Sequence, residues 1–132
     1  MRYCADTWFF IQLANGHPKA LEIWKEIKDG KGRLAVSTVV IAETIKQLLR
    51  KNLQKDLESL SNAFGTSEKI TVVDVTNEIA NEAGKFSYSQ DMPIIDGIIQ
   101  ATAISMNYPN ILTNDEHYKP AERQKLIKRV FW

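Results

Sequence analysis

The sequence contains one cysteine, Cys4, and only two histidines among its 132 residues. With a single cysteine no intramolecular disulfide is possible, and neither a disulfide framework nor a cysteine-based zinc site can be built. The sequence also has no cluster of cysteine and histidine that would select zinc or copper. These scarcities exclude small disulfide-stabilised secreted domains and fit a reducing compartment.

Long apolar runs and a dominant charge are also missing. No run approaches the roughly 20 apolar residues that span a bilayer, and no apolar stretch typical of a signal peptide follows the first residues. We therefore expect a cytoplasmic protein that is neither exported nor embedded in a membrane. The 17 Lys and Arg residues nearly balance the 16 Asp and Glu residues, for a net charge of +1, so any nucleic-acid site must be local.

The composition is that of an ordinary globular protein. Hydrophobic residues make up 44% of the chain and charged residues 25%, which is close to average usage. The length matches that of one compact domain and leaves no room for two independent cores. Because we find no linker, repeat or low-complexity segment, we predict a single domain over residues 1–132.

Hydrophobic periodicity predicts strands and helices that alternate along the chain. Short apolar or β-branched runs predict strands at residues 2–5, 34–36, 70–75, 111–112 and 129–131. Helical spacing and capping residues predict helices at residues 8–13, 18–29, 38–49, 55–64, 78–88 and 93–106, with Gly30 and Gly65 ending the second and the fourth. Strands joined through helices imply crossover connections. We therefore predict an α/β fold of three layers, α/β/α, with a central, mostly parallel sheet.

Acidic residues follow two of the predicted strands. Asp6 follows the first strand and Asp115 follows the fourth, while Ser37 follows the second strand and begins the helix that carries Glu43. In open parallel sheets, ligands bind beyond the carboxyl ends of the strands. A cluster of carboxylates is therefore possible at that edge of the sheet.

Glu43 and Asp96 interrupt apolar sequence, so we expect both to be buried or nearly so. An ionised carboxylate there loses hydration worth several kcal/mol unless hydrogen bonds, a basic partner or a metal ion compensate. Two carboxylates about 4 Å apart repel each other by roughly 4 kcal/mol at an effective dielectric of about 20, and a bound cation would convert that cost into affinity. Only oxygen ligands are available, which selects Mg²⁺ or Mn²⁺. The residues alone therefore favour metal-dependent phosphate chemistry.

Four segments, in this order, resemble the PIN-domain ribonucleases, and in size the chain is similar to the VapC toxins of VapBC toxin–antitoxin pairs. The segments are residues 3–7 (YCADT), 37–43 (STVVIAE), 96–103 (DGIIQATA), and 112–115 (LTND) with Tyr118. The resemblance covers essentially the whole chain. Trp8 departs from the pattern, because family members often have a small polar residue at that position.

The resemblance implies an endoribonuclease that hydrolyses RNA with metal-activated water and leaves a 5′-phosphate and a 3′-hydroxyl. It also implies a homodimer and a cognate antitoxin protein as partner. Four acids, called the acidic quartet below, would hold Mg²⁺ or Mn²⁺ and carry catalysis: Asp6, Glu43, Asp96 and Asp115. Asp6 and Asp96 would be the principal ligands, and Thr113 and Asn114 would support the quartet.

Each member of the acidic quartet also has a simpler interpretation. Asp6 can accept hydrogen bonds from backbone N–H groups, and Glu43 can pair with Lys46, three residues further along a helix. Asp96 can stabilise a helix amino terminus through its charge, and Asp115 can be an ordinary turn residue. Taken singly, each acid leaves the choice open.

The basic residues and histidines allow similar alternatives. Lys46 and Arg50 belong to a short basic stretch that can contact RNA phosphates, although a solvated helix face is the commoner reason for such charges. We expect His17 and His117 to lie on the surface, with His117 close enough to Asp115 in sequence to approach a substrate phosphate.

Two other functions remain open from the sequence. One is a catalytically silent PIN-like domain that only binds RNA or a protein partner. The other is a phospho-receiver domain, which also gathers acids around Mg²⁺ but needs a phosphoacceptor after its third strand. The sequence predicts that Asp74 lies within the third strand, and this placement disfavours the receiver.

Overall fold

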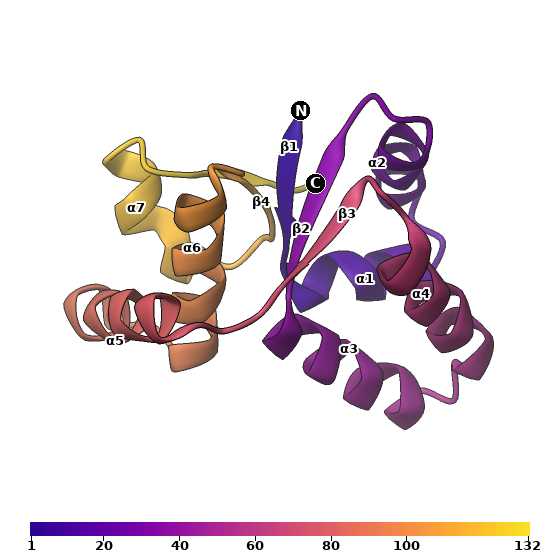
Figure 1. The fold of residues 1–132 in the computed structure, drawn as a ribbon, viewed down its shortest axis with the longest axis horizontal. Coiled ribbons are helices and arrows are strands. Elements are labelled where there is room, and N and C mark those ends of the chain that lie inside the picture. The colour runs from indigo at the N-terminus through magenta and orange to yellow at the C-terminus, as the bar shows by residue number, and fades with distance from the viewer.

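The computed structural model describes residues 1–132 and contains five short strands and seven α-helices (Figure 1). The strands are β1 (Arg2–Ala5), β2 (Arg33–Ser37), β3 (Ile70–Val73), β4 (Asn110–Leu112) and β5 (Lys128–Val130). The helices are α1 (Thr7–Ala14), α2 (Pro18–Lys28), α3 (Thr38–Arg50), α4 (Gln54–Thr66), α5 (Asn77–Gln90), α6 (Ile94–Met106) and α7 (Lys119–Arg123), with a 3-10 turn η1 (Glu116–Tyr118) before α7.

The five strands form one sheet in the order β3-β2-β1-β4-β5, and every pairing is parallel. Helices α1 to α4 lie on one side of the sheet and α5 to α7 on the other (Figure 1). The predicted three-layer α/β/α fold is therefore confirmed. The chain places β2 on one side of β1 and β4 on the other, so the strand order reverses at β1. Parallel sheets bind ligands at such a switch point, beyond the carboxyl ends of the strands.

The centre of the molecule is apolar on both faces of the sheet. In β1 and β2 every residue after the first is buried, as expected for inner strands of a parallel sheet. Helix α6 lies between the sheet and α5 and buries six of its 13 residues. Gly97 allows this close packing, because a Cβ atom there would lie 2.6 Å from the carbonyl oxygen of Ala83 in α5. The first turn of α6 is thereby held against two layers of structure.

The structure corrects the predicted ends of α4 and β3 and adds two short elements. Gly65 does not end α4, which continues to Thr66, where the hydroxyl donates to the carbonyl oxygen of Asn62 at 2.7 Å. Strand β3 ends at Val73 instead of residue 75, because Val73 is in register with Ser37, the last residue of its partner β2. The short elements η1 and α7 were not predicted, since a helix of five residues or fewer shows no hydrophobic period.

None of the helices combines the length and apolar character needed to cross a membrane.

Candidate metal centre

Asp6 lies at the carboxyl end of β1 and links three segments of the chain. The residue is only 9% exposed. Its Oδ1 atom caps α1 by accepting the backbone N–H of Thr7 at 2.7 Å. Its Oδ2 atom accepts the hydroxyl of Thr113 at 2.7 Å, and that hydroxyl in turn accepts the backbone N–H of Asp115 at 3.1 Å. The buried Thr113 hydroxyl therefore joins the ends of the neighbouring strands β1 and β4.

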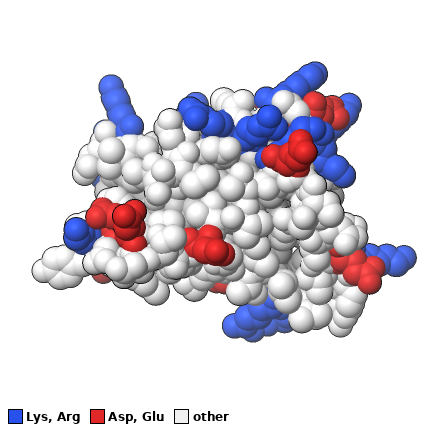
Figure 2. Space-filling model, viewed as in Figure 1, with Lys and Arg blue, Asp and Glu red and all other residues white.

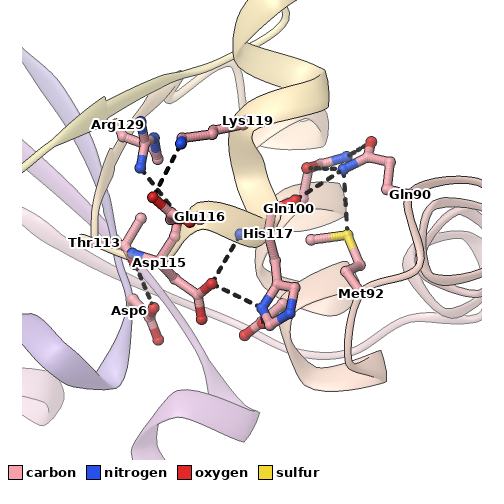
Figure 3. Close-up of polar contacts among 11 residues, drawn as sticks. Asp6, Gln90, Met92, Gln100, Thr113, Asp115, Glu116, His117, Lys119 and Arg129 are labelled. Atoms are coloured by element: carbon pink, nitrogen blue, oxygen red, sulfur yellow. Dashed lines mark hydrogen bonds and ion pairs between the residues drawn. The ribbon is translucent and has the colours of Figure 1, made fainter.

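Asp115 and Asp96 meet at the imidazole of His117, and Figure 3 shows Asp115 beside that ring. Asp115 caps the turn η1, because its Oδ1 atom accepts the backbone N–H of His117 at 2.8 Å. The same oxygen lies 2.7 Å from Nδ1 of His117. Asp96, in the first turn of α6, places Oδ2 at 3.3 Å from that nitrogen. One ligand atom from each of the three residues lies within 4.8 Å of the other two.

Glu43 reaches the same edge of the sheet from α3, which begins after the Ser37 cap. Its Oε1 atom accepts the hydroxyl of Thr7 at 3.1 Å. Because the backbone N–H of Thr7 also bonds to Asp6, Thr7 ties Glu43 to the end of β1. No ion pair forms between Glu43 and Lys46. The structure therefore brings all four acids to one edge, with Asp96 and Asp115 in the tightest group.

The quartet has no lysine or arginine to balance its negative charge. Burial, together with the charges of Asp115 and Glu43, raises the pKa of Asp6 to about 6, although the hydrogen bonds from Thr113 and Thr7 act to lower it. Burial and the charges of its acidic neighbours likewise raise the pKa of Asp96 to about 6, although His117 acts to lower it. No lysine or arginine forms an ion pair with any of the four acids. Many Lys and Arg side chains gather instead along the upper edge in Figure 2, where β1 begins.

A buried hydroxyl without a partner adds to this imbalance. Tyr118 follows His117 and is completely buried, and its hydroxyl forms no hydrogen bond. Burial raises the pKa of Tyr118 well above its usual range, and the charges of Asp6 and Asp96 raise it further, so the hydroxyl lies near the quartet. Carboxylate oxygens without a lysine or arginine partner are suitable ligands for a divalent cation, and a ligand bound to that cation could hydrogen-bond to the free hydroxyl. We conclude that the residues present suit Mg²⁺ or Mn²⁺.

A protein-family model matches most of the chain. The PIN domain model matches residues 3–123, a range that contains the whole acidic quartet. The chain belongs to the PIN domain family. The family resemblance noted from the four sequence segments is thereby confirmed, whereas a comparison with curated proteins gives no match.

Solved structures share the fold of this PIN domain over nearly its full length. A chain of VapBC2 from Rickettsia felis, determined with a DNA fragment from the promoter, is 18% identical with a TM-score of 0.72, and the alignment covers 100% of this chain and 99% of that one. VapC20 from Mycobacterium tuberculosis, a Sarcin-Ricin loop cleaving toxin, is 20% identical with a TM-score of 0.72, covering 90% and 94%. VapBC-1 from nontypeable Haemophilus influenzae is 22% identical with a TM-score of 0.67, covering 100% and 98%. At these identities the likeness shows the fold alone.

Some predicted site residues form no side-chain hydrogen bond or ion pair with the quartet of this PIN domain. Asn114 is exposed, and its side chain does not hydrogen-bond to the quartet, whereas Thr113 does. Lys46 and Arg50 are exposed on α3 and form no ion pair. The supporting role of Asn114 and the RNA contacts of the two basic residues stay predictions.

His117 is the site residue that sequence reasoning underrated. Its side chain is 46% exposed, as expected of a surface histidine, but its Nδ1 atom also lies within 3.3 Å of two carboxylate oxygens. The donor set at this edge is therefore not limited to oxygen, as the sequence analysis assumed. The available signal was the two-residue spacing from Asp115, which a tight turn converts into a contact.

The structure also corrects the position of Asp74. The residue does not lie within β3 but follows it directly, which is the position that a phosphoacceptor requires. However, β2 separates β3 from β1, so Asp74 is two strands away from Asp6. Asp74 and Asp6 therefore do not share a site, which argues against the phospho-receiver alternative.

Proposed function

We propose that this PIN domain is a metal-dependent endoribonuclease that hydrolyses RNA phosphodiester bonds and is the toxin of a VapBC-type toxin–antitoxin pair. The observation that carries the proposal is the convergence of the acidic quartet, without a lysine or arginine partner, at the switch point of the sheet. The fold shared with VapBC complexes and with a toxin that cleaves the Sarcin-Ricin loop supports the biological role.

We assign metal binding and catalysis to the acidic quartet. A bound Mg²⁺ or Mn²⁺ ion supplies a Lewis acid that activates water and stabilises the charge developing on the phosphate. The protein's own residues orient the ligands: the Thr113 hydroxyl fixes one oxygen of Asp6, and the Thr7 hydroxyl fixes one oxygen of Glu43. Because these donors are held by the ends of β1 and β4, the carboxylates are positioned before a cation binds.

The substrate and partners follow from the same proposal. Lys46 and Arg50 lie on α3 beyond Glu43, so both can contact RNA phosphates near the bond that is cleaved. A cognate antitoxin and a second copy of the chain complete the assembly that we propose, with the VapBC complexes of the same fold as support. Neutralising both basic residues should raise KM for RNA and weaken its dependence on salt, with little change in kcat.

The test is cleavage of single-stranded RNA by the purified full chain, freed of any co-purifying protein by unfolding and refolding. We expect cleavage in Mg²⁺ or Mn²⁺ and none in EDTA, with products that carry a 5′-phosphate by mass spectrometry. Asp6→Asn and Asp96→Asn should each abolish cleavage while circular dichroism stays unchanged. Asp29→Asn is the matched control, because Asp29 is exposed and caps the carboxyl end of α2, before the amino end of β2.

Two results would contradict the proposal. Cleavage that survives both substitutions in the quartet, or survives EDTA, would rule out this metal mechanism. RNA or protein binding without cleavage in either metal would point to the catalytically silent PIN-like module instead.

A further inference from the structure

His117 is the only nitrogen donor within the tight group of ligands. Its Nδ1 atom lies 2.7 Å from Asp115 Oδ1 and 3.3 Å from Asp96 Oδ2. Ligands placed at right angles around an octahedral ion, each roughly 2.1 Å from it, lie about 3 Å apart. The two separations at His117 are thus those of neighbouring ligands on one cation.

The backbone of His117 is held on two sides, so the position of the imidazole is built into the fold. On one side its N–H donates to Asp115. On the other side its carbonyl oxygen accepts Gln90 Nε2 at 3.5 Å. Gln90 is itself fixed by the completely buried Gln100, because the two amides exchange hydrogen bonds of 3.1 and 2.7 Å (Figure 3). The carboxyl end of α5 and the middle of α6 therefore position the turn that carries His117.

A second observation indicates that this group receives a ligand. The hydroxyl of Tyr118, the next residue, is buried without a partner, although the charges of Asp6 and Asp96 lie near it. A buried hydroxyl costs stability unless it forms a hydrogen bond. A coordinated ligand of a cation between these carboxylates would provide one.

We propose that His117 is a ligand of the cation held by Asp96 and Asp115, and that this nitrogen makes the centre prefer Mn²⁺ to Mg²⁺. The inference rests on the proposed function for the presence of a cation and adds the identity of one ligand and of the metal. Mg²⁺ favours oxygen ligands and retains its water, whereas imidazole binds transition metals more readily along the Irving–Williams order. A site of carboxylates alone would discriminate less between the two ions.

The sharpest test is pulsed electron paramagnetic resonance of the full chain loaded with Mn²⁺, because echo modulation detects a directly bound imidazole nitrogen. We expect nitrogen modulation in the wild type that changes when the histidines are labelled with ¹⁵N. The modulation should disappear in His117→Gln and persist in His17→Gln. His17 is the matched control, since it is the only other histidine, caps α2 and stacks on Trp132.

Titration with each metal gives a second readout that does not depend on catalysis. In His117→Gln the affinity for Mn²⁺ should fall on the order of tenfold, while the affinity for Mg²⁺ changes much less. Mn²⁺ binding that Asp96→Asn abolishes, but that shows no nitrogen modulation in the wild type, would overturn the role of His117 and leave the proposed function intact. Failure of the wild type to bind either metal would overturn both.

Discussion

Two carboxylate environments in this molecule have pKa shifts of opposite direction, although burial acts to raise the pKa in both. Glu122 in α7 receives the backbone N–H of Arg129 at 2.8 Å and its Nε at 3.0 Å. Burial acts to raise the pKa of Glu122, but the hydrogen bonds and charge of Arg129 outweigh it and lower the pKa below its usual value. Asp6 and Asp96 have no such cation, and the pKa of each rises to about 6.

The difference shows where the chain provides a positive charge and where it does not. At Glu122 an arginine side chain that is only 10% exposed supplies it and ties β5 to α7. At the carboxyl ends of β1 and β4 the acids retain their mutual repulsion. That repulsion lowers the stability of the metal-free fold. Because a bound divalent cation relieves the repulsion, the free energy recovered on binding contributes to metal affinity.

The largest expected effect is the loss of metal binding when one acid of the quartet is neutralised. Asp96→Asn removes a charged ligand from the tightest group, so we expect the affinity for Mn²⁺ to fall about 100-fold or more. Isothermal titration calorimetry measures it directly, and Asp29→Asn should bind as the wild type does. An unchanged dissociation constant in Asp96→Asn would place the cation elsewhere.

The next effect concerns the compensated carboxylate. Glu122→Gln leaves Arg129 without its counter-charge while its side chain is largely buried, which should lower the free energy of unfolding by about 2 kcal/mol. Urea denaturation provides the measurement. Glu116→Gln is the control, because Glu116 pairs with Lys119 on the surface, and exposed ion pairs contribute little. Equal effects of the two substitutions would contradict the proposed importance of burial.

The helices and strands of this fold were largely predictable from the sequence, and the reason is local. Hydrophobic period, Pro18 at a helix start and the Ser37 and Thr76 caps all act within a few residues. The ends of β1 and β4 were predictable too, so Asp6 and Asp115 could be assigned to one edge of the sheet. Boundaries that depend on a neighbouring strand were not predictable. An example is β3, which ends where its partner β2 ends.

The contacts within the site lay beyond local reasoning. Asp96 and His117 come from α6 and η1, and their meeting depends on how α6 packs between the sheet and α5. The hydrogen bond from Thr7 to Glu43 likewise joins α1 to α3 across 36 residues. Glu122 and Arg129 are seven residues apart, but the short helix that carries Glu122 gives no periodic signal. These contacts depend on three-dimensional packing, which no residue pattern in the sequence records.

A smaller effect, of opposite sign to that of Glu122→Gln, tests the repulsion itself. In EDTA, Asp96→Asn should increase the free energy of unfolding at pH 7 by about 1 kcal/mol, because one of the repelling charges is removed. With saturating Mn²⁺ the order should reverse, since the wild type gains more from the bound ion. Urea denaturation in both conditions checks this. Destabilisation of the EDTA-treated variant would show that Asp96 contributes to the fold through a contact instead.

The last effect is a pH slope that separates the two carboxylate environments. Between about pH 4 and pH 6 the metal-free fold keeps protons on Asp6 and Asp96 that the unfolded chain has released, because the pKa is about 6 in the fold against 3.8 for an unperturbed carboxyl. Stability should therefore fall as pH rises through this window, by at most about 1.4 kcal/mol per pH unit for each proton. Glu122 has the opposite effect on stability below its ordinary pKa of 4.5: stability falls as pH falls, because protonation removes its bond to Arg129.

Asp96→Asn should flatten the slope between pH 4 and 6 in urea titrations, and Glu122→Gln should leave that slope unchanged. If the two substitutions altered the same part of the profile, the contrast between a carboxylate with a built-in cation and one without would not hold.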